Sequence, residues 1–428
     1  MPFSFFWVFL ICMALGVPIV FALAAGPLAG FLIADKLLFL KMLPQRMFGG
    51  IAQFPILAIP LFILAGELMN VSGITQRLVN FANTLIGHIR AGLAQTNIVA
   101  SMMFAGLSGS AVADTSAIGS ILIPAMEKDG YSKQFAAAVT AASSVIGPII
   151  PPSIIMIIYA YVMKVPVAAL FLAGLVPGVM VGVGLILVTY YIGKRRNYPK
   201  AHKRASAGEL WQAFRLAFLP LLTPLIILGG IVTGVVTPTE AAGLAVFYAL
   251  ILSLFVMRTV KLADLSGILY RTGLLSSTIL LLVGSATIFG WAATISGVPQ
   301  ALGRLLLTIT DNPILLLLLV NVLLLVIGMF LDAVPAILIL GPIFGPALAQ
   351  FGVDPVHFAI IMCINVTVGL ATPPMGMILF VASSLTKTGI EVISRELWPY
   401  LAVHLTVIVL VSMFPALALT IPKALGFM

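Results

Sequence analysis

Two short segments of the sequence place polar and charged residues deep inside apolar surroundings. The first, "GLSGSAVADTSAIG" at 106–119, holds Asp114 among serines and glycines, and the second, "IGMFLDAVPA" at 327–336, holds Asp332. Ionisable residues far from the ends of apolar segments are costly and mark ion or substrate pathways in membrane proteins. We therefore assign Asp332 a functional role. For Asp114 three roles remain open: a cation ligand, a cap of the following helix, or a residue at the edge of a cavity.

Proline pairs interrupt two further apolar segments, "SSVIGPIIPPSIIMIIYA" at 143–160 and "NVTVGLATPPMGMILFVA" at 365–382. Proline has no backbone N–H, so it frees carbonyl groups one turn earlier in a helix. Freed carbonyls and the C-terminal ends of half-helices can bind a small cation, whereas N-terminal ends favour an anion. A kinked structural helix would explain one such pair, but a matching pair in each half of the chain favours a binding site.

Motifs for other chemistry are missing from the sequence. The four histidines are scattered, no phosphate-binding loop or dinucleotide motif is present, and no Ser/His/Asp set has a supporting context. ATP-driven transport by this chain is therefore disfavoured. An enzyme acting within the membrane is also disfavoured, because the acidic residues are isolated rather than paired.

The composition indicates that membrane helices must position these residues. The chain has 428 residues, of which 61% are hydrophobic and 8% charged, and its mean hydropathy is +1.21. Soluble domains carry about 25% charged residues, and a membrane helix needs roughly 20 apolar residues. We predict an all-α polytopic membrane protein in contact with lipid. Its net charge of +9 reflects basic cytoplasmic loops, and no nucleic-acid partner is expected.

An internal repeat relates the two halves of the chain. Shifting the first half by 222 positions, or by 224 further upstream, places glycines and prolines on residues of the same type, which indicates shared backbone geometry. The matches include Pro124 with Pro346, Gly130 with Gly352, Gly147 with Gly369, and Pro151-Pro152 with Pro373-Pro374. Each half then has six elements, and one extra helix at 210–235 turns the second half upside down. This is an inverted-topology repeat.

The repeat divides the chain into transport and scaffold segments. Residues 93–166 and 313–396 are the first and second transport segments, and each contains a hairpin followed by a broken helix. The other segments are scaffold helices with an arm at 1–92, scaffold helices with a basic cytoplasmic loop at 167–274, a helix and arm at 275–312, and a C-terminal scaffold helix at 397–428.

The hairpins are predicted to be re-entrant. Segment 93–126 has 34 residues, fewer than the roughly 40 that two crossings require, and it breaks at its polar centre. Its tip should stop near the middle of the membrane, where irregular backbone survives only inside protein or beside a water-filled cavity. Segment 313–350 should form the second hairpin and enter from the opposite side.

Positive charges predict the orientation. We place the loop "GKRRNYPKAHKRASAGE" in the cytoplasm, together with most other basic residues. The N-terminus then lies inside, and 3–33 forms the first single crossing, too long for the apolar core of a signal peptide. The C-terminus lies outside. The basic residues left outside are Lys36, Lys41, Arg46, Lys164, Arg304 and Lys423.

The chain resembles the large membrane subunit of tripartite ATP-independent periplasmic (TRAP) transporters over essentially its whole length. The motifs are "GLSGSAVADTSAIGSILIPAMEKDGY", "IGPIIPPSIIMIIYA", "GVVTPTEAAG" and "GLATPPMG". The resemblance implies an elevator-type importer of the ion-transporter superfamily in the bacterial inner membrane, driven by Na+. It implies an organic acid anion as substrate: sialic acid, a C4-dicarboxylate or a sugar acid. It also implies a small four-helix membrane subunit, expected as a separate polypeptide, and a periplasmic substrate-binding protein.

The resemblance also implies two sodium sites. The first would use Ala105, Ser108, Gly147 and Pro151, and the second Asp332, Gly369, Thr372 and Met375. The arrangement of two facing tips places the substrate between them, near Ser110, Asp114, Thr115 and Asn365. Three alternatives remain: a stand-alone sodium-coupled di- or tricarboxylate carrier, which would share the hairpins, an intramembrane enzyme and a channel.

Overall fold

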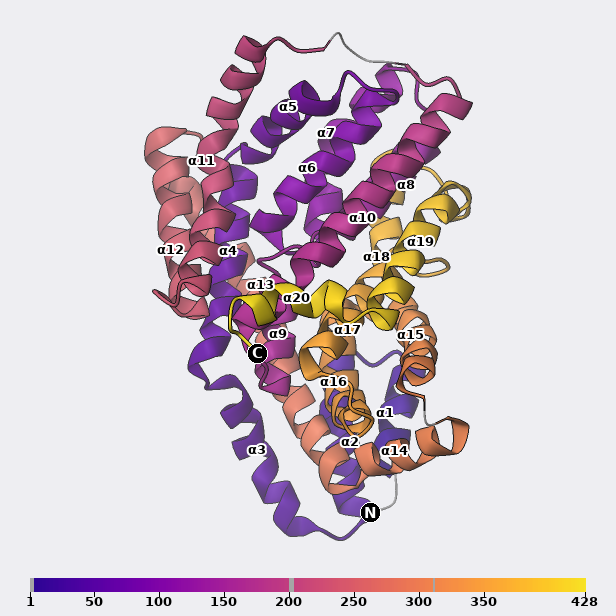
Figure 1. The fold of residues 1–428 in the computed structure, drawn as a ribbon. Helices are drawn as coiled ribbons and strands as arrows, with labels where there is room; N and C mark the ends of the chain where they lie inside the picture. Colours follow the sequence, from indigo (N-terminus) through magenta and orange to yellow (C-terminus); the bar gives the residue numbers. More distant parts are fainter. Residues whose placement is uncertain (1–3, 200–203, 311) are drawn as a thin grey trace.

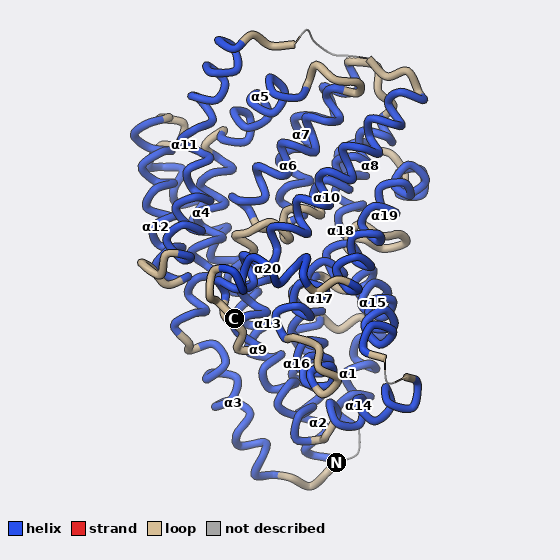
Figure 2. The backbone as a smooth tube through the Cα atoms, in the orientation of Figure 1, coloured by secondary structure: helices blue, strands red, loops and turns tan. Residues whose placement is uncertain are grey.

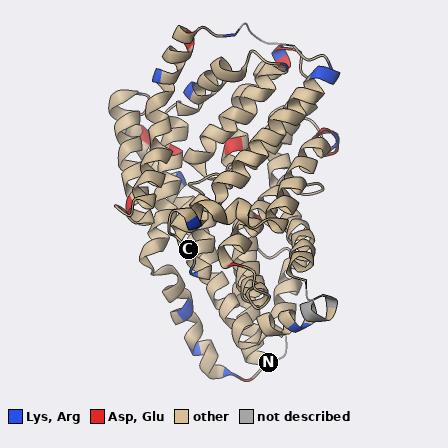
Figure 3. Cartoon of the chain, in the orientation of Figure 1, with Lys and Arg blue, Asp and Glu red and all other residues tan. Residues whose placement is uncertain are grey.

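The chain folds almost entirely into helices. The computed structural model describes residues 4–199, 204–310 and 312–428, and 81% of the structure is helical, with no strand in these ranges (Figure 2). Seven helical stretches in the described ranges are long and apolar enough to cross a membrane. Charged residues occupy only a small part of the ribbon (Figure 3). The prediction of an all-α polytopic membrane protein is confirmed.

Two helical hairpins lie in opposite halves of the molecule (Figure 1). The first consists of α6 (Gly92–Ser108) and α7 (Ala111–Lys128) and turns at residues 109–110. The second consists of α15 (Pro313–Phe330) and α16 (Ala333–Ala349) and turns at residues 331–332. The helices of 17 or 18 residues turn back at a polar tip, so both hairpins lie where the sequence predicted them, and their re-entrance remains a prediction.

Each hairpin is followed by a helix that breaks at its proline pair. In the first half α8 (Lys133–Ser144) gives way to α9 (Ile154–Met163), and in the second half α17 (Pro355–Gly369) gives way to α18 (Met377–Thr386). Both proline pairs lie inside the breaks and contain a cis peptide bond. In Figure 1 the chain descends from α8 to α9 but rises from α17 to α18. The two halves therefore run in opposite directions, as the inverted repeat requires.

The two halves interlock through reciprocal packing. α7 packs against α18 of the other half, and α16 packs in the same way against α9. The long helices α10 (Val167–Arg195) and α19 (Ile390–Met413) contact each other, and each also packs against the opposite half's broken helix. The hairpins, broken helices and long helices thus form one interlocked unit.

The remaining helices pack reciprocally as well. α2 (Ile19–Ile33) packs against α13 (Leu262–Ile295), and α12 (Pro238–Ile251) packs against α4 (Ala58–Val71). An ion pair between Arg271 and Glu67 at 3.1 Å joins α13 to α4. The other elements of this scaffold are α3 (Leu37–Ile51), η1 (Phe54–Leu57), α11 (Ala207–Val232) and the π-helix η2 (Leu252–Val256), and the arms are α5 (Ile74–Ile86) and α14 (Val298–Ile309).

The prediction of a single crossing at 3–33 is wrong. These residues form two helices, α1 (Ser4–Ala14) and α2, which pack together as a hairpin because the chain turns at Gly16, whose φ of +77° suits glycine. Figure 1 places α1 and α2 at the end of the molecule opposite the basic C-terminal end of α10. The first described helix, α1, therefore does not begin on the predicted cytoplasmic side.

Two other sequence-based boundaries also change. α11 packs against α12 in the second half as α1 packs against α2 in the first, so the helix predicted at 210–235 is part of a matching pair and not an unpaired addition. The segment predicted as a C-terminal scaffold helix at 397–428 contains the end of α19, which stops at Met413 and belongs to the interlocked unit, and a separate helix, α20 (Ala416–Ala424), which packs against α10.

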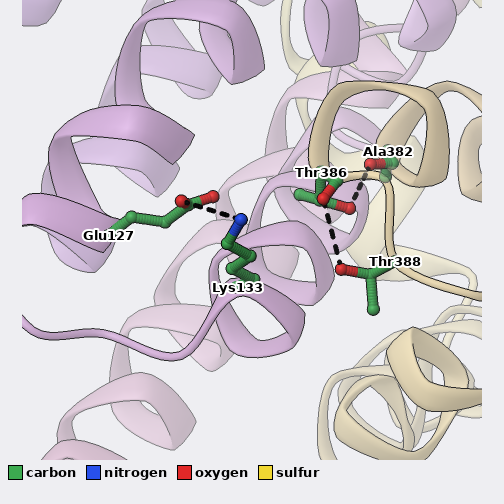
Figure 4. Close-up of polar contacts among 5 residues, drawn as sticks. All are labelled: Glu127, Lys133, Ala382, Thr386 and Thr388. Carbon is green, nitrogen blue, oxygen red and sulfur yellow. Dashed lines mark hydrogen bonds and ion pairs between the residues drawn. The ribbon is translucent and has the colours of Figure 1, made fainter.

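The turn between α7 and α8 lies beside the end of α18. Lys133 and Glu127 form an ion pair of 3.5 Å across this turn, and nearby the Thr386 hydroxyl donates a hydrogen bond to the Ala382 carbonyl at 2.9 Å (Figure 4). The first hairpin and the second half's broken helix therefore meet at their outer ends as well as along their lengths.

Candidate binding sites at the hairpin tips

Each hairpin tip contacts the broken helix of its own half, backbone against backbone. A Cβ atom added to Gly109 would lie 2.8 Å from the Pro152 carbonyl oxygen, and one added to Gly147 would lie 3.4 Å from the carbonyl carbon of Ser110. In the second half, a Cβ atom on Gly369 would lie 2.5 Å from the carbonyl carbon of Gly328. At Gly109 and Gly369 the two backbone segments approach too closely for a side chain, whereas Gly147 is in ordinary van der Waals contact with the tip.

The first tip gathers the residues proposed for the first sodium site. The Ala105 carbonyl accepts the Gly109 N–H at 3.2 Å, and the Ser108 hydroxyl lies 3.4 Å from the Ser110 nitrogen. Ser110 caps α7, since its hydroxyl accepts the Ala113 N–H at 3.4 Å. The Gly147 and Pro151 backbones lie against this turn. Carbonyl and hydroxyl oxygens are thus concentrated where two helices end and two begin.

Asp114 lies one turn beyond the tip and is fully buried. It does not cap α7, because Ser110 occupies that position, so the capping role left open by the sequence is wrong. The hydroxyls of Ser101 and Ser144 face its carboxylate, yet neither carboxylate oxygen makes a hydrogen bond within the described part of the chain. Thr115 is also buried, and its hydroxyl donates to the Ala111 carbonyl at 2.9 Å.

A buried polar network lies behind Asp114, between α6 and α8. The Asn97 amide donates to Thr140 Oγ1 at 2.7 Å, Ser143 Oγ donates to Asn97 Oδ1 at 2.9 Å, and Ser101 Oγ donates to Ser143 Oγ at 3.1 Å. Our sequence interpretation missed this network. Its signal was the spacing of polar residues three or four apart in two neighbouring apolar helices, which places them on one face of each helix.

The second tip is built around Asp332. Asp332 caps α16, because its Oδ1 accepts the Ala333 N–H at 2.8 Å, and it is partly exposed. The backbone contact of Gly328 with Gly369 brings this tip against the break. Thr372 lies in the break, where its hydroxyl donates to the Val368 carbonyl at 2.7 Å, and the Met375 side chain is exposed.

Asn365 has two hydrogen-bond partners inside the protein. Its amide nitrogen donates to Asn321 Oδ1 at 2.9 Å and to the Ile361 carbonyl at 2.9 Å, and Asn321 in turn donates to Ser412 Oγ at 2.8 Å. The internal repeat relates this Asn321–Asn365 contact to the Asn97–Ser143 contact of the first half. The substrate role of Asn365, like those of Asp114 and Thr115, remains a prediction, and all three side chains are buried in this structure.

The oxygen donors at the tips suit a hard cation. Within the described ranges, no three His, Cys, Asp or Glu side chains gather as a metal-binding group. The available donors are backbone carbonyls, hydroxyls and the Asp332 carboxylate, which are oxygen ligands of the kind that hard cations prefer. Discontinuous helices that meet at the interface of inverted repeats define the fold of a secondary transporter.

Comparison with known proteins identifies the family. The family described as "Tripartite ATP-independent periplasmic transporter, DctM component" matches residues 6–417. The chain is 42% identical to the sialic acid TRAP transporter large permease protein SiaM of Vibrio cholerae, over 95% of each chain. It is 37% identical to the C4-dicarboxylate TRAP transporter large permease protein DctM of Rhodobacter capsulatus, over 97% of each. The chain therefore belongs to the DctM family and is the large permease component of a TRAP transporter.

A solved structure shares the fold. The Alcanivorax borkumensis YdaH transporter superimposes with a TM-score of 0.61 and covers 96% of this chain and 97% of its own, at 17% sequence identity. At that identity the similarity concerns the fold alone. It agrees with the polytopic transporter architecture described above.

Proposed function

We propose that this chain imports an organic acid anion together with Na+ across a bacterial inner membrane. It would act with a small four-helix membrane subunit and a periplasmic binding protein that delivers the substrate. The observation that carries the proposal is the meeting of each hairpin tip with a broken helix, in two halves of opposite orientation. The family membership supports a tripartite assembly.

The helix ends at the tips and breaks support binding of both a cation and an anion. Four helices end here, α6 and α15 at the tips and α8 and α17 at the breaks, and their C-terminal ends carry partial negative charge that favours a cation. Four others begin there, α7, α9, α16 and α18, and their N-terminal N–H groups favour an anion. Sodium ions at the two proposed sites would therefore neutralise the carbonyl ends and leave the N-terminal ends for a carboxylate.

The reciprocal packing supports movement of the transport segments as one body. The hairpins and broken helices interlock with one another, whereas α5 and α14 connect them to the scaffold at opposite ends of the molecule (Figure 1). We propose that the loaded unit slides against the scaffold as an elevator. An inward electrical gradient contributes about 2.3 kcal/mol per sodium charge per 100 mV.

The substrate class follows from the relatives. Two of them are named for sialic acid and for C4-dicarboxylates, at 42% and 37% identity. Both are organic acid anions, and a carboxylate would suit the N-terminal end of α7 at Ser110. We therefore propose sialic acid, a C4-dicarboxylate or a sugar acid as the substrate.

Sodium-driven uptake by proteoliposomes tests the proposal. The chain is reconstituted with its cognate small subunit and binding protein, and uptake of labelled sialate and succinate is measured with and without an inward sodium gradient. We expect uptake of one anion only when all three proteins and the gradient are present. Uptake by this chain alone would instead indicate a stand-alone carrier, and uptake independent of sodium would contradict the coupling.

A further inference from the structure

A large cavity lies between the scaffold and the transport unit, away from the hairpin tips. Its volume is about 1050 Å³, at the upper end of the range for small-molecule sites. One wall comes from α3, the loop before α12 and the C-terminal part of α13, and the other comes from α9, its junction with α10, and α16. Figure 1 places α3, α9 and α16 in the same half of the molecule as α1 and α2.

The charged residues that line this cavity are both basic. Among its described lining residues, Arg46 on α3 and Lys164 at the C-terminal end of α9 are the charged ones, and both are exposed. The Arg46 guanidinium lies over the Trp291 ring, 5.2 Å from its centre, so an aromatic face holds it in place. Within the described ranges, neither basic group forms an ion pair with an acidic side chain.

We propose that this cavity is a separate binding site for an organic anion, in which Arg46 and Lys164 bind the carboxylate before the anion reaches the hairpin tips. This inference rests on the proposed function, since it assigns a second site to the same substrate class. A cavity lined by charge of one sign focuses the electric field and raises the local concentration of the opposite ion.

The two basic residues belong to walls that the proposed movement would separate. Lys164 follows α9 of the transport unit, and Arg46 lies on α3 of the scaffold. The two walls are in contact in this structure, because the Tyr161 hydroxyl donates a hydrogen bond to the Gly50 carbonyl at 2.8 Å. An anion bound by both residues would therefore be released from one of them when the transport unit slides.

Charge-selective labelling inside the cavity tests this site without requiring transport. Gln53, an exposed lining residue, is replaced in the full chain by Gln53→Cys after Cys12→Ala and Cys363→Ala remove the native thiols. The rates of reaction with an anionic and a neutral methanethiosulfonate are measured in proteoliposomes, with and without the small subunit. The matched control is Arg304→Gln, which removes another exposed basic residue from the same half of the molecule on α14, outside the cavity lining.

We expect the anionic-to-neutral rate ratio to fall about tenfold in the Arg46→Gln/Lys164→Gln double variant and to stay unchanged in Arg304→Gln. Sialate or succinate should slow the neutral reagent in the parent protein but not in the double variant. A ratio that changes by less than about twofold, or protection that survives the double substitution, would overturn the site. Loss of labelling by both reagents after assembly with the small subunit would also overturn it, because protein would then cover the cavity. Failure of sodium-driven uptake with normal labelling would count against the proposed function alone.

Discussion

The two hairpin tips share a backbone design but differ in their charged residues. In the first half a serine, Ser110, caps the second hairpin helix, and Asp114 is buried one turn further along without a hydrogen-bond partner in the described chain. In the second half the cap is itself an acid, Asp332, which is partly exposed. The repeat thus reproduces the positions of carbonyl groups and helix ends, whereas the carboxylates are placed differently. The two halves are therefore expected to bind ions with unequal strength.

The contacts behind the tips show the same relation. At matching positions, Asn97 bonds to a hydroxyl of Ser143 in the first half, and Asn321 bonds to the amide of Asn365 in the second. Both contacts join the first hairpin helix to the broken helix inside an apolar interior, where an unpaired polar group is costly. The two halves share the packing of these two helices but use different side chains for the hydrogen bond between them.

Of the substitutions considered, Asp332→Ala should reduce uptake most. It tests the difference between the two tips, because it removes the acid that caps the second hairpin helix in the second half. The substitution removes a charged oxygen ligand and the cap of α16, so we expect sodium-dependent uptake to fall about 100-fold, since interactions with charged groups contribute about 1.5–3 kcal/mol. Initial uptake rates at several sodium concentrations measure this. Asp332→Asn serves as the control, because it keeps a capping oxygen and removes the charge. Wild-type sodium dependence in either variant would show that Asp332 is not an ion ligand.

Asp114→Asn should affect uptake less and stability in the opposite direction. A buried carboxylate without a hydrogen bond destabilises the fold, so its neutral amide should raise the thermal midpoint by about 1–3 °C. Uptake should fall less than about tenfold, because the buried carboxylate lies away from any open surface. Thermal unfolding in detergent and uptake are measured on the same preparation. A loss of uptake equal to that of Asp332→Ala would show that Asp114 contacts an ion or the substrate in another conformation.

Substituting the glycines of the two breaks tests how tightly the backbone packs at each tip. In Gly369→Ala the new methyl group would lie 2.5 Å from the carbonyl carbon of Gly328, whereas in Gly147→Ala it would lie 3.4 Å from the carbonyl carbon of Ser110. We expect losses in stability of about 3 kcal/mol for Gly369→Ala and about 1 kcal/mol for Gly147→Ala, because overpacking typically costs 1–3 kcal/mol. Thermal or chemical unfolding of the purified variants measures both. An equal loss would mean that the two tips are packed equally tightly.

The sequence predicted those parts of the fold that backbone chemistry determines. Glycine and proline at matching positions located both hairpins and both breaks, because these residues limit which conformations a membrane helix can adopt. The hairpin of α1 and α2 was missed, because its apolar residues satisfy the length of one crossing and only Gly16 and Pro18 mark the turn. Hydropathy cannot distinguish a bent pair from a crossing when both are apolar.

The sequence predicted which segments meet at the hairpin tips but not all the contacts that they make there. Asp332 was identified because an acid far from the ends of an apolar segment has few structural explanations. Asn365 was assigned to the substrate from its expected place near the two facing tips, yet its hydrogen bonds with Asn321 and Ile361 give it a structural explanation that sequence spacing did not reveal. A polar residue in a membrane helix can bind a ligand or form a hydrogen bond to another helix, and only the position of its partner distinguishes the two roles.

The smallest effects are expected at the turns that enter the broken helices, which match at Gly130 and Gly352. In the second half Asp354 caps α17, since its carboxylate accepts the Val356 N–H at 2.8 Å, so Asp354→Ala should cost about 1 kcal/mol of stability. In the first half no side chain caps α8, and the turn carries instead the ion pair of Lys133 with Glu127, whose side chains are 59% and 28% exposed. Lys133→Ala should cost less than about 0.5 kcal/mol, because solvent screens exposed pairs. Unfolding midpoints at low and high salt distinguish the two: the Asp354→Ala loss should persist in salt, and a Lys133→Ala loss as large as that of Asp354→Ala would contradict the ranking.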